Sequence, residues 1–314
     1  MVAKDTISTE FLGLALRSPI VLLSGCVGFG DEYSRVEGFS NKSIGGAVLK
    51  GTTLEPRLGN APHRVVETPA GMLNSIGLQN PGVDEVVGGI LPSLEPPETH
   101  YFANVSGSTI EEYVAVTKKF DRSCVSGIEL NISCPNVKRG GMEFGNDPEM
   151  SARVVEACKK VTTKPLITKL SPNQTDIQKN ASYCIEAGSD GLSVINTISG
   201  MAINIQSRAP ALGNEVGGLS GPAIKPIALL KVREVYGVAK KHGVPIMGQG
   251  GISSASDAIE FMLAGSSTIG IGTALFFDPL VCEKINQGLR RYLKEQGFAS
   301  VGDLVGSLKK STKE

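Results

Sequence analysis

The chain of 314 residues contains no tryptophan, and aromatic residues make up only 5% of it. Proteins that bind single-stranded nucleic acids stack bases on aromatic side chains, so this shortage disfavours such a role. The 31 basic and 31 acidic residues balance, which gives no reason to expect a polyanionic partner. The sequence holds no run of ~20 apolar residues and no signal-peptide core in residues 1–17, so we expect a soluble, cytoplasmic protein.

The sequence also lacks the ligand spacings of common metal sites. Its six cysteines stand at positions 26, 124, 134, 158, 184 and 282 without any Cys-x-x-Cys pair, and the 3 histidines are far apart. This disfavours a structural zinc site or an iron–sulfur cluster carried by this chain alone, so we expect no metal. In a cytoplasmic protein most of these thiols are expected to be reduced packing residues.

Short β-branched runs alternate with segments whose apolar residues recur at helical spacing. We predict strands at residues 20–23, 46–50, 101–105, 127–131, 166–169, 191–196, 245–248 and 268–272. We predict helices at residues 109–120, 148–161, 176–187, 222–242, 256–264 and 279–294. The strands are apolar throughout rather than alternating, which is typical of a parallel sheet covered on both faces. Eight such units within ~300 residues predict an α/β fold, a (β/α)8 TIM barrel, as a single domain over residues 1–314.

Two connections are longer than the others, one after Lys50 and one after Asn196. Both leave the C-terminal ends of predicted strands, where TIM barrels build their active sites. We therefore predict long functional loops over the C-terminal face of the barrel. Residues 6–19 are expected to form a small N-terminal cap at the opposite end.

The run NISCPN at residues 131–136 is the most informative segment. It follows a predicted strand, so its side chains would lie at the exit of that strand. A cysteine there can take or give a proton if its surroundings tune its pKa, and asparagines offer donors and acceptors to a planar ligand. Cys134 is thus a candidate catalytic residue, and Asn131 and Asn136 are candidate ligand contacts. The alternative is a tight turn with a small buried cysteine.

Glycine-rich segments end two of the later strands. GQGGI occupies residues 248–252 and IGT occupies residues 271–273, each before a predicted helix or helical turn. Backbone N–H groups at such positions can hold a phosphate with help from a helix dipole, and TIM barrels often place phosphate sites after strands seven and eight. The two segments together predict a phosphate site, whereas a lone glycine pair would indicate only a turn.

Lys50 and Lys169 end two further strands in largely apolar surroundings. A buried lysine is costly unless it is paired or faces a ligand. Each of these lysines could therefore face the barrel mouth, and the alternative for each is a salt bridge within the barrel core.

Further carboxamides come from the long loops and strand ends. Asn74 lies in the first long loop, and Asn196-Thr197 ends the sixth predicted strand. With Asn131 and Asn136 they form a set of polar groups suited to a flat ligand rich in amide and carboxylate groups.

In these segments the chain resembles the dihydroorotate dehydrogenases, flavoprotein enzymes of pyrimidine (UMP) biosynthesis. The most specific segments are NISCPN at 131–136, MLNSIGLQNPG at 72–82, KLSP at 169–172 and GGLSGPAIKP at 217–226. The soluble class of the family carries a cysteine base where Cys134 stands, whereas the membrane-linked class carries serine. Residues 136–145 and 217–226 are most similar to the catalytic subunit of the NAD-linked class 1B type, which works with a second subunit carrying FAD and a [2Fe-2S] cluster.

The resemblance implies FMN in the barrel mouth with (S)-dihydroorotate stacked on one face of the flavin. Cys134 would remove the C5 proton of the substrate while a hydride leaves C6 for the flavin, and Lys169 would stabilise negative charge on the flavin ring. The implied substrate-binding residues are Lys50, Asn74, Ser75, Ile76, Gly77, Leu78, Asn131, Asn136, Asn196 and Thr197. The implied cofactor-binding residues are Ser24, Gly25, Lys50, Asn104, Asn131, Lys169, Ile195, Ser220, Gly221, Gly250, Gly251, Gly272 and Thr273.

Two positions depart from the family pattern. Asn204 stands where Asp is expected, and Ala209 stands where a basic residue is expected. Both lie in the second long loop, so they put partner contacts or loop stability in doubt more than the reaction. The resemblance suggests a homodimer within a heterotetramer that includes the FAD/iron–sulfur subunit.

Three alternatives stay open at this point. A dihydropyrimidine dehydrogenase-like FMN oxidoreductase would act on a pyrimidine base without a carboxylate. A fumarate-dependent dihydroorotate dehydrogenase would need no partner subunit. A non-catalytic barrel would bind a phosphate ligand or serve as an interaction subunit, and would carry no flavin.

Overall fold

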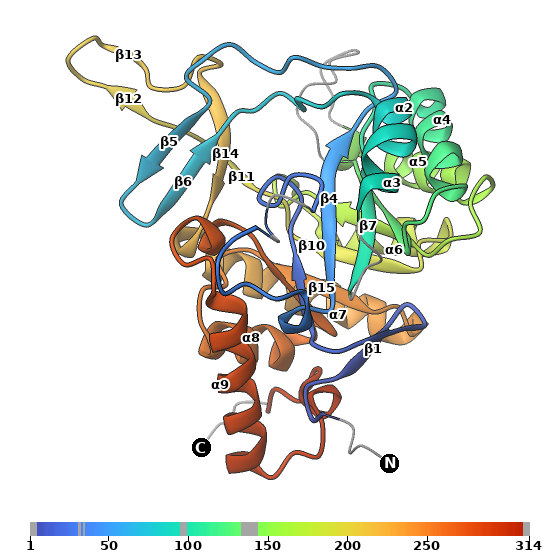
Figure 1. The fold of residues 1–314 in the computed structure, drawn as a ribbon, viewed down its shortest axis with the longest axis vertical. Helices are drawn as coiled ribbons and strands as arrows, with labels where there is room; N and C mark the ends of the chain where they lie inside the picture. The colour runs from blue at the N-terminus through green and yellow to red at the C-terminus, as the bar shows by residue number, and fades with distance from the viewer. Residues whose placement is uncertain (1–4, 31–32, 34, 95–98, 133–143, 310–314) are drawn as a thin grey trace.

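The computed structural model describes residues 5–30, 33, 35–94, 99–132 and 144–309, and a closed barrel of parallel strands forms its centre (Figure 1). The barrel strands are β3 (Ile20–Leu22), β4 (Gly46–Thr52), β7 (His100–Val105), β8 (Gly127–Asn131), β9 (Leu166–Leu170), β10 (Gly191–Val194), β15 (Ile246–Gln249) and β16 (Thr268–Ile271). Each strand pairs with its sequence neighbour, and β16 pairs with β3 to close the ring. The predicted (β/α)8 barrel is confirmed, and every predicted strand overlaps one of these.

Helices cover the outside of the barrel (Figure 1). They are α4 (Ile110–Asp121), α5 (Pro148–Lys159), α6 (Ile177–Glu186), α7 (Lys225–His242), α8 (Ala255–Ala264) and α9 (Val281–Gln296). Short 3-10 turns are η1 (Asn41–Ser43), η3 (Phe144–Asn146), η4 (Pro222–Ile224), η5 (Thr273–Phe276) and η6 (Val301–Leu304). Several helices begin at side chains that accept hydrogen bonds from otherwise unpaired N–H groups, among them Thr109, Asp147, Asp176 and Ser254. All six predicted helices are present.

The connection between β4 and β7 contains helical turns that the sequence analysis did not predict. They are α2 (Val83–Glu85), the π-helical turn η2 (Val86–Ile90) and α3 (Leu91–Ser93). Two glycines and Pro92 interrupt this segment, and both residue types weaken helix propensity. Packing rather than propensity therefore holds it, because Val83, Val86 and Leu91 belong to the main buried cluster.

A small apolar cluster fills the lower part of the barrel. Strands β1 (Thr9–Phe11) and β2 (Leu14–Leu16) form an antiparallel hairpin, and Phe11 and Leu16 are buried against side chains from the barrel strands. The barrel contributes Val21, Val48, Phe102, Ile167 and Met247 to the same cluster. The predicted N-terminal cap is confirmed, and it closes the end opposite the C-terminal rim.

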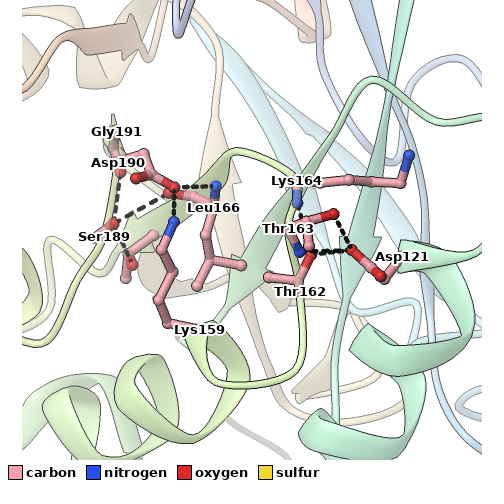
Figure 2. Close-up of polar contacts among 10 residues, drawn as sticks. Asp121, Lys159, Thr162, Thr163, Lys164, Leu166, Ser189, Asp190 and Gly191 are labelled. Carbon is pink, nitrogen blue, oxygen red and sulfur yellow. Dashed lines mark hydrogen bonds and ion pairs between the residues drawn. The ribbon is translucent and has the colours of Figure 1, made fainter.

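Polar contacts fasten the turns that enter two barrel strands, as Figure 2 shows. The Asp190 carboxylate, just before β10, accepts hydrogen bonds from the backbone N–H of Leu166 at 2.8 Å and from Lys159 Nζ at 2.6 Å. One side chain thus joins the start of β9 to the start of β10 and to the end of α5. The Lys159–Asp190 ion pair is only about two-thirds buried, so Asp190 stabilises the fold mainly through its hydrogen bond to the backbone.

A second carboxylate, that of Asp121, holds the turn that leads into β9 (Figure 2). Asp121, at the end of α4, accepts the backbone N–H of Thr163 at 2.7 Å and the hydroxyl of Thr162 at 2.8 Å. The pKa of Asp121 is held below its usual range, first by the hydrogen bond from the Thr163 N–H and second by the one from the Thr162 hydroxyl. A depressed carboxyl pKa means that this contribution to stability is present above pH ~4 and is lost as the pH falls through the folded-state pKa.

Replacing Asp190 with alanine should destabilise the barrel. It leaves the Leu166 N–H and the Lys159 ammonium without this acceptor, which we expect to cost about 2 kcal/mol, or about 3 °C in melting temperature for a chain of this length. Glu156→Ala is the matched control, because it removes an exposed ion pair with Lys160 on the same helix α5. Thermal melts followed by circular dichroism test this, and equal melting temperatures for the two variants would contradict it.

Candidate functional site

The two long connections fold into one antiparallel sheet over the C-terminal end of the barrel (Figure 1). Its strands are β5 (Val65–Thr68) and β6 (Gly71–Asn74) from the first connection, and β11 (Ile198–Met201) and β14 (Val216–Ser220) from the second. A further hairpin of β12 (Ile203–Asn204) and β13 (Ala209–Pro210) projects from this sheet. Between the sheet and the barrel rim lies a pocket of about 1260 Å³, enough for a cofactor and a small substrate together.

The pocket collects residues that the sequence analysis singled out at widely separated positions. Its lining includes the predicted cofactor residues Ser24, Gly25, Lys50, Asn104, Asn131, Lys169, Ile195, Ser220, Gly221, Gly250, Gly251, Gly272 and Thr273. It also includes the predicted substrate residues Asn74, Ser75, Ile76, Gly77, Leu78, Asn196 and Thr197, besides Lys50 and Asn131. Cys134 and Asn136 lie outside the described residues, and the chain is described as far as Ile132, next to the pocket residue Asn131.

Hydrogen bonds hold the carboxamides of the pocket in place. Asn131 ends β8, and its carbonyl accepts a hydrogen bond from the Tyr113 hydroxyl of α4 at 2.7 Å. Asn196 Nδ2 donates to Asn131 Oδ1 at 3.2 Å, while Asn196 Oδ1 accepts the N–H of Thr197 at 2.8 Å. Asn74 on β6 donates to the carbonyl of Gly218 on β14 at 3.3 Å. The amide groups are therefore oriented in advance, as recognition of a flat polar ligand requires.

The two lysines sit differently in the pocket. Lys169 is only 6% exposed, lines the pocket, and lies 3.9 Å from the carboxylate of Glu129 on the neighbouring strand. Lys169 thus pairs with a carboxylate inside the barrel, one alternative from the sequence, and also lines the pocket at the barrel mouth, the other alternative. Lys50 is half-buried and lines the pocket too.

Several polar side chains of the barrel interior were missed by the sequence analysis. Glu129 is fully buried and accepts hydrogen bonds from Asn104 Nδ2 at 2.6 Å and from the Ser193 hydroxyl at 2.5 Å. Gln249 is buried at the end of β15 and donates to the carbonyl of Ile195 at 2.9 Å. The signal was available, since a glutamate within an otherwise apolar strand is rare unless it is paired.

The glycines after β15 have a backbone that other residues adopt poorly. Gly250 and Gly251 have φ values of 126° and 81°, and a Cβ on Gly251 would lie 2.8 Å from the Gly221 carbonyl oxygen. The following turn is held by Asp257 of α8, which accepts the N–H of Ser253 at 3.0 Å. A compact loop with bare backbone, directly before a helix, is the arrangement that cradles phosphate groups.

The loop after β16 is tied to the sheet above the pocket. The Thr273 hydroxyl donates to Ser220 Oγ at 2.8 Å, and the Ser220 hydroxyl in turn donates to the carbonyl of Met72 at 3.3 Å. The cradle and the sheet therefore form one connected wall of the pocket.

Cys26 is a thiol in the pocket that the sequence analysis did not assign to the site. Burial raises the pKa of Cys26 to about 11, although the positive charges of Lys169 and Lys50 act in the opposite direction. Its thiol is therefore protonated at neutral pH, which makes it a poor general base.

The pocket fits a flat ligand that carries a phosphate group. The glycine cradle lies at the ends of β15 and β16, a buried lysine faces the interior, and two buried acceptors in the wall, Asn104 Oδ1 and Gln249 Oε1, have no hydrogen-bond partner within the described residues. Unpaired buried acceptors are costly unless a ligand satisfies them. These features are typical of (β/α)8 barrel enzymes that hold a phosphate-bearing cofactor at the mouth.

Comparisons with known proteins identify the family. The dihydroorotate dehydrogenase family profile matches residues 6–293. The protein named dihydroorotate dehydrogenase B (NAD(+)), catalytic subunit, of Geotalea daltonii is 49% identical over 308 residues, which cover 98% of this chain and 99% of the relative. Proteins of the same name from Pelobacter propionicus and Oceanobacillus iheyensis are 49% and 47% identical, over 97% and 95% of this chain and 99% and 97% of theirs. The chain therefore belongs to the dihydroorotate dehydrogenase family.

Two further observations concern the described part of the chain. None of its helices is long and apolar enough to cross a membrane. No group of three or more His, Cys, Asp and Glu side chains in these residues is placed to hold a metal ion.

The departures from the family pattern, Asn204 and Ala209, lie opposite each other in the β12–β13 hairpin. Asn204 Oδ1 accepts hydrogen bonds from the N–H groups of Gln206 and Ser207 and so shapes the turn of this hairpin.

Family membership implies FMN, and Gly251→Ala should weaken its binding. The added Cβ meets the Gly221 carbonyl, so the cradle must shift, and we expect at least a roughly tenfold loss of FMN affinity. Gly243→Ala is the matched control: its φ of 67° is also left-handed, but a Cβ there meets nothing within 4 Å, and it lies at the far end of α7. Fluorescence titration of the apoprotein with FMN measures both, and equal affinities would contradict the placement of the phosphate.

Proposed function

We propose that this protein oxidises (S)-dihydroorotate to orotate in pyrimidine biosynthesis, with FMN as its cofactor. The observation that carries the proposal is that one pocket holds the glycine cradle, the buried Lys169 and the oriented carboxamides of Asn131 and Asn196, in a chain of the dihydroorotate dehydrogenase family. A phosphate, a ring that gains negative charge on reduction and a pyrimidine carboxylate each find matching groups there.

In this proposal FMN binds along the pocket wall, and when bound it supplies the acceptor for the substrate hydride. Gly250, Gly251, Gly272 and Thr273 hold its phosphate through backbone N–H groups. Ser24, Gly25, Lys50, Asn104, Asn131, Ile195, Ser220 and Gly221 line the rest of the cofactor. Lys169, which lines the pocket, would stabilise the negative charge that reduction adds to the flavin ring.

The carboxamides and the first long loop bind the substrate. Asn74, Asn131, Asn136, Asn196 and Thr197 hold the pyrimidine ring and its carboxylate, with Lys50 nearby. In the first long loop, backbone N–H groups around Gly77 and Leu78 act as donors, next to Ser75 and Ile76. Cys134 removes the proton at C5. Cys26 does not compete for this role, because its buried thiol stays protonated at neutral pH.

The electrons leave toward NAD through a second subunit that carries FAD and a [2Fe-2S] cluster. The name of the relatives, dihydroorotate dehydrogenase B (NAD(+)), catalytic subunit, supports this route. We propose a homodimer of this chain within a heterotetramer. Phe276 and Phe277, which line the rim of the pocket and are more than half exposed, supply apolar surface of the kind that protein contacts use. The single-domain organisation over residues 1–314 and the cytoplasmic location stay predictions.

An anaerobic visible spectrum tests the proposal directly. The purified chain, loaded with FMN, should lose its flavin absorbance when (S)-dihydroorotate is added, because the reductive half-reaction needs no partner subunit. Dihydrouracil, which lacks the carboxylate, should leave the flavin oxidised. Bleaching by dihydrouracil instead would move the chain to a dihydropyrimidine dehydrogenase-like activity, and a chain that binds no FMN would be a non-catalytic barrel.

Cys134→Ala should slow flavin reduction by dihydroorotate by about 10²–10⁴-fold at neutral pH while FMN stays bound, because a general base is lost. The wild-type rate should rise with pH toward the ordinary thiol pKa of ~8.5, since only the thiolate accepts the proton. Cys124→Ala is the matched control, since Cys124 is an exposed cysteine that does not line the pocket. Stopped-flow absorbance gives the rates, and a Cys134→Ala rate near that of Cys124→Ala would remove the cysteine base.

A further inference from the structure

A buried carboxylate lies directly beneath the pocket and belongs to no role assigned so far. Glu129 in the middle of β8 has 0% exposure and does not line the pocket. Its Oε1 accepts Asn104 Nδ2 at 2.6 Å from β7 and faces Lys169 Nζ of β9 at 3.9 Å. Its Oε2 accepts the Ser193 hydroxyl of β10 at 2.5 Å. One side chain thus contacts polar groups on three other barrel strands.

The groups around Glu129 compensate a negative charge on its side chain. A carboxylate cut off from water is strongly disfavoured unless cations and donors compensate it, and here two neutral donors and one ammonium do so. Two hydrogen-bond donors point at its two oxygens, one at each. Lys169 and Glu129 are therefore a compensated pair, 8% and 0% exposed in their side chains.

The partners of Glu129 are themselves pocket residues. Lys169 and Asn104 both line the pocket, one strand away from Glu129 on either side. The bond from Asn104 Nδ2 to the carboxylate also sets the orientation of that amide, since Asn104 Oδ1 must then point elsewhere and is left without a partner within the described residues. Glu129 thus reaches the site through two groups that line the pocket, without lining the pocket itself.

We propose that Glu129 is a positioning residue that sets the reduction potential of the bound flavin, by compensating the charge of Lys169 and fixing the orientation of Asn104. The inference rests on the proposed function, because it needs FMN in the pocket that Lys169 lines. Reduction adds electron density to the flavin, so a nearby cation favours the reduced form and a nearby anion opposes it. Glu129 therefore lowers the potential that Lys169 alone would produce, and so it favours release of the electrons to the next acceptor.

Three variants separate the charge of Glu129 from its structural contacts. Glu129→Gln keeps the size of the side chain and removes the charge. Glu129→Asp keeps the charge and shortens the side chain. Ser193→Ala removes one hydrogen bond to the same carboxylate and leaves the charge in place.

The measurement is the midpoint potential of the FMN-loaded protein, determined by equilibration with redox dyes. We expect Glu129→Gln to shift the equilibrium constant for flavin reduction about tenfold toward the reduced form, which is about 30 mV for this two-electron couple. Glu129→Asp and Ser193→Ala should stay within about threefold of the wild type, because the charge remains. Lys169→Gln should shift the potential in the opposite direction.

The outcomes also distinguish this inference from the proposed function. If the wild type binds FMN and is reduced by dihydroorotate but Glu129→Gln has an unchanged potential, the proposed function stands and the role of Glu129 is wrong. Equal shifts in all three Glu129 and Ser193 variants would reveal a packing effect and would equally overturn it. Should Glu129→Gln fail to fold, Lys169→Gln and the double variant Lys169→Gln/Glu129→Gln decide, because removal of both partners leaves no uncompensated charge. The role of Glu129 requires a higher potential in the double variant than in Lys169→Gln, and equal potentials would overturn it.

Discussion

In a barrel of parallel strands the last residues of all strands lie at the same rim, and the side chains of each strand alternate between its two faces. These two constraints together build the pocket. In β4, β7, β9 and β15 an apolar residue of the lower cluster is followed two positions later by a polar pocket residue: Val48 and Lys50, Phe102 and Asn104, Ile167 and Lys169, Met247 and Gln249. The interior therefore changes from apolar to polar within two residues in each of these four strands, in β4 across an irregularity of its pairing between Val48 and Gly51.

This change within the barrel explains how charged groups are tolerated so deep in the protein. The apolar layer below excludes water and the hairpin of residues 9–16 seals it, so the polar layer above must satisfy itself or a ligand. Glu129 and Lys169 compensate each other, whereas the acceptors Asn104 Oδ1 and Gln249 Oε1 have no hydrogen-bond donor within the described residues. The same few polar groups of the barrel interior therefore contribute both to stability and to ligand binding.

The barrel could be predicted from the sequence because its strands are continuous apolar runs and its helices have regular apolar faces. The polar residues at strand ends were predicted as site residues for the same reason, since the rim brings them together. The sheet over the pocket could not be predicted, because its strands are short and β6 pairs with β14 more than 140 residues further along the chain. Glu129 was missed because it lies inside an apolar run, and the assignment of a base to Cys134 came from resemblance rather than from geometry.

The pairing of β6 with β14 joins two insertions that leave different sides of the barrel, with Asn74 opposite Gly218. Neither insertion has its full set of backbone partners alone, because each would leave an unpaired strand edge over the pocket. Each insertion therefore depends on the other for its backbone hydrogen bonds. Exchanging one of them for the loop of another barrel would leave an unpaired strand edge in the other, so a design that reshapes this pocket has to replace both insertions together or keep both and change single side chains.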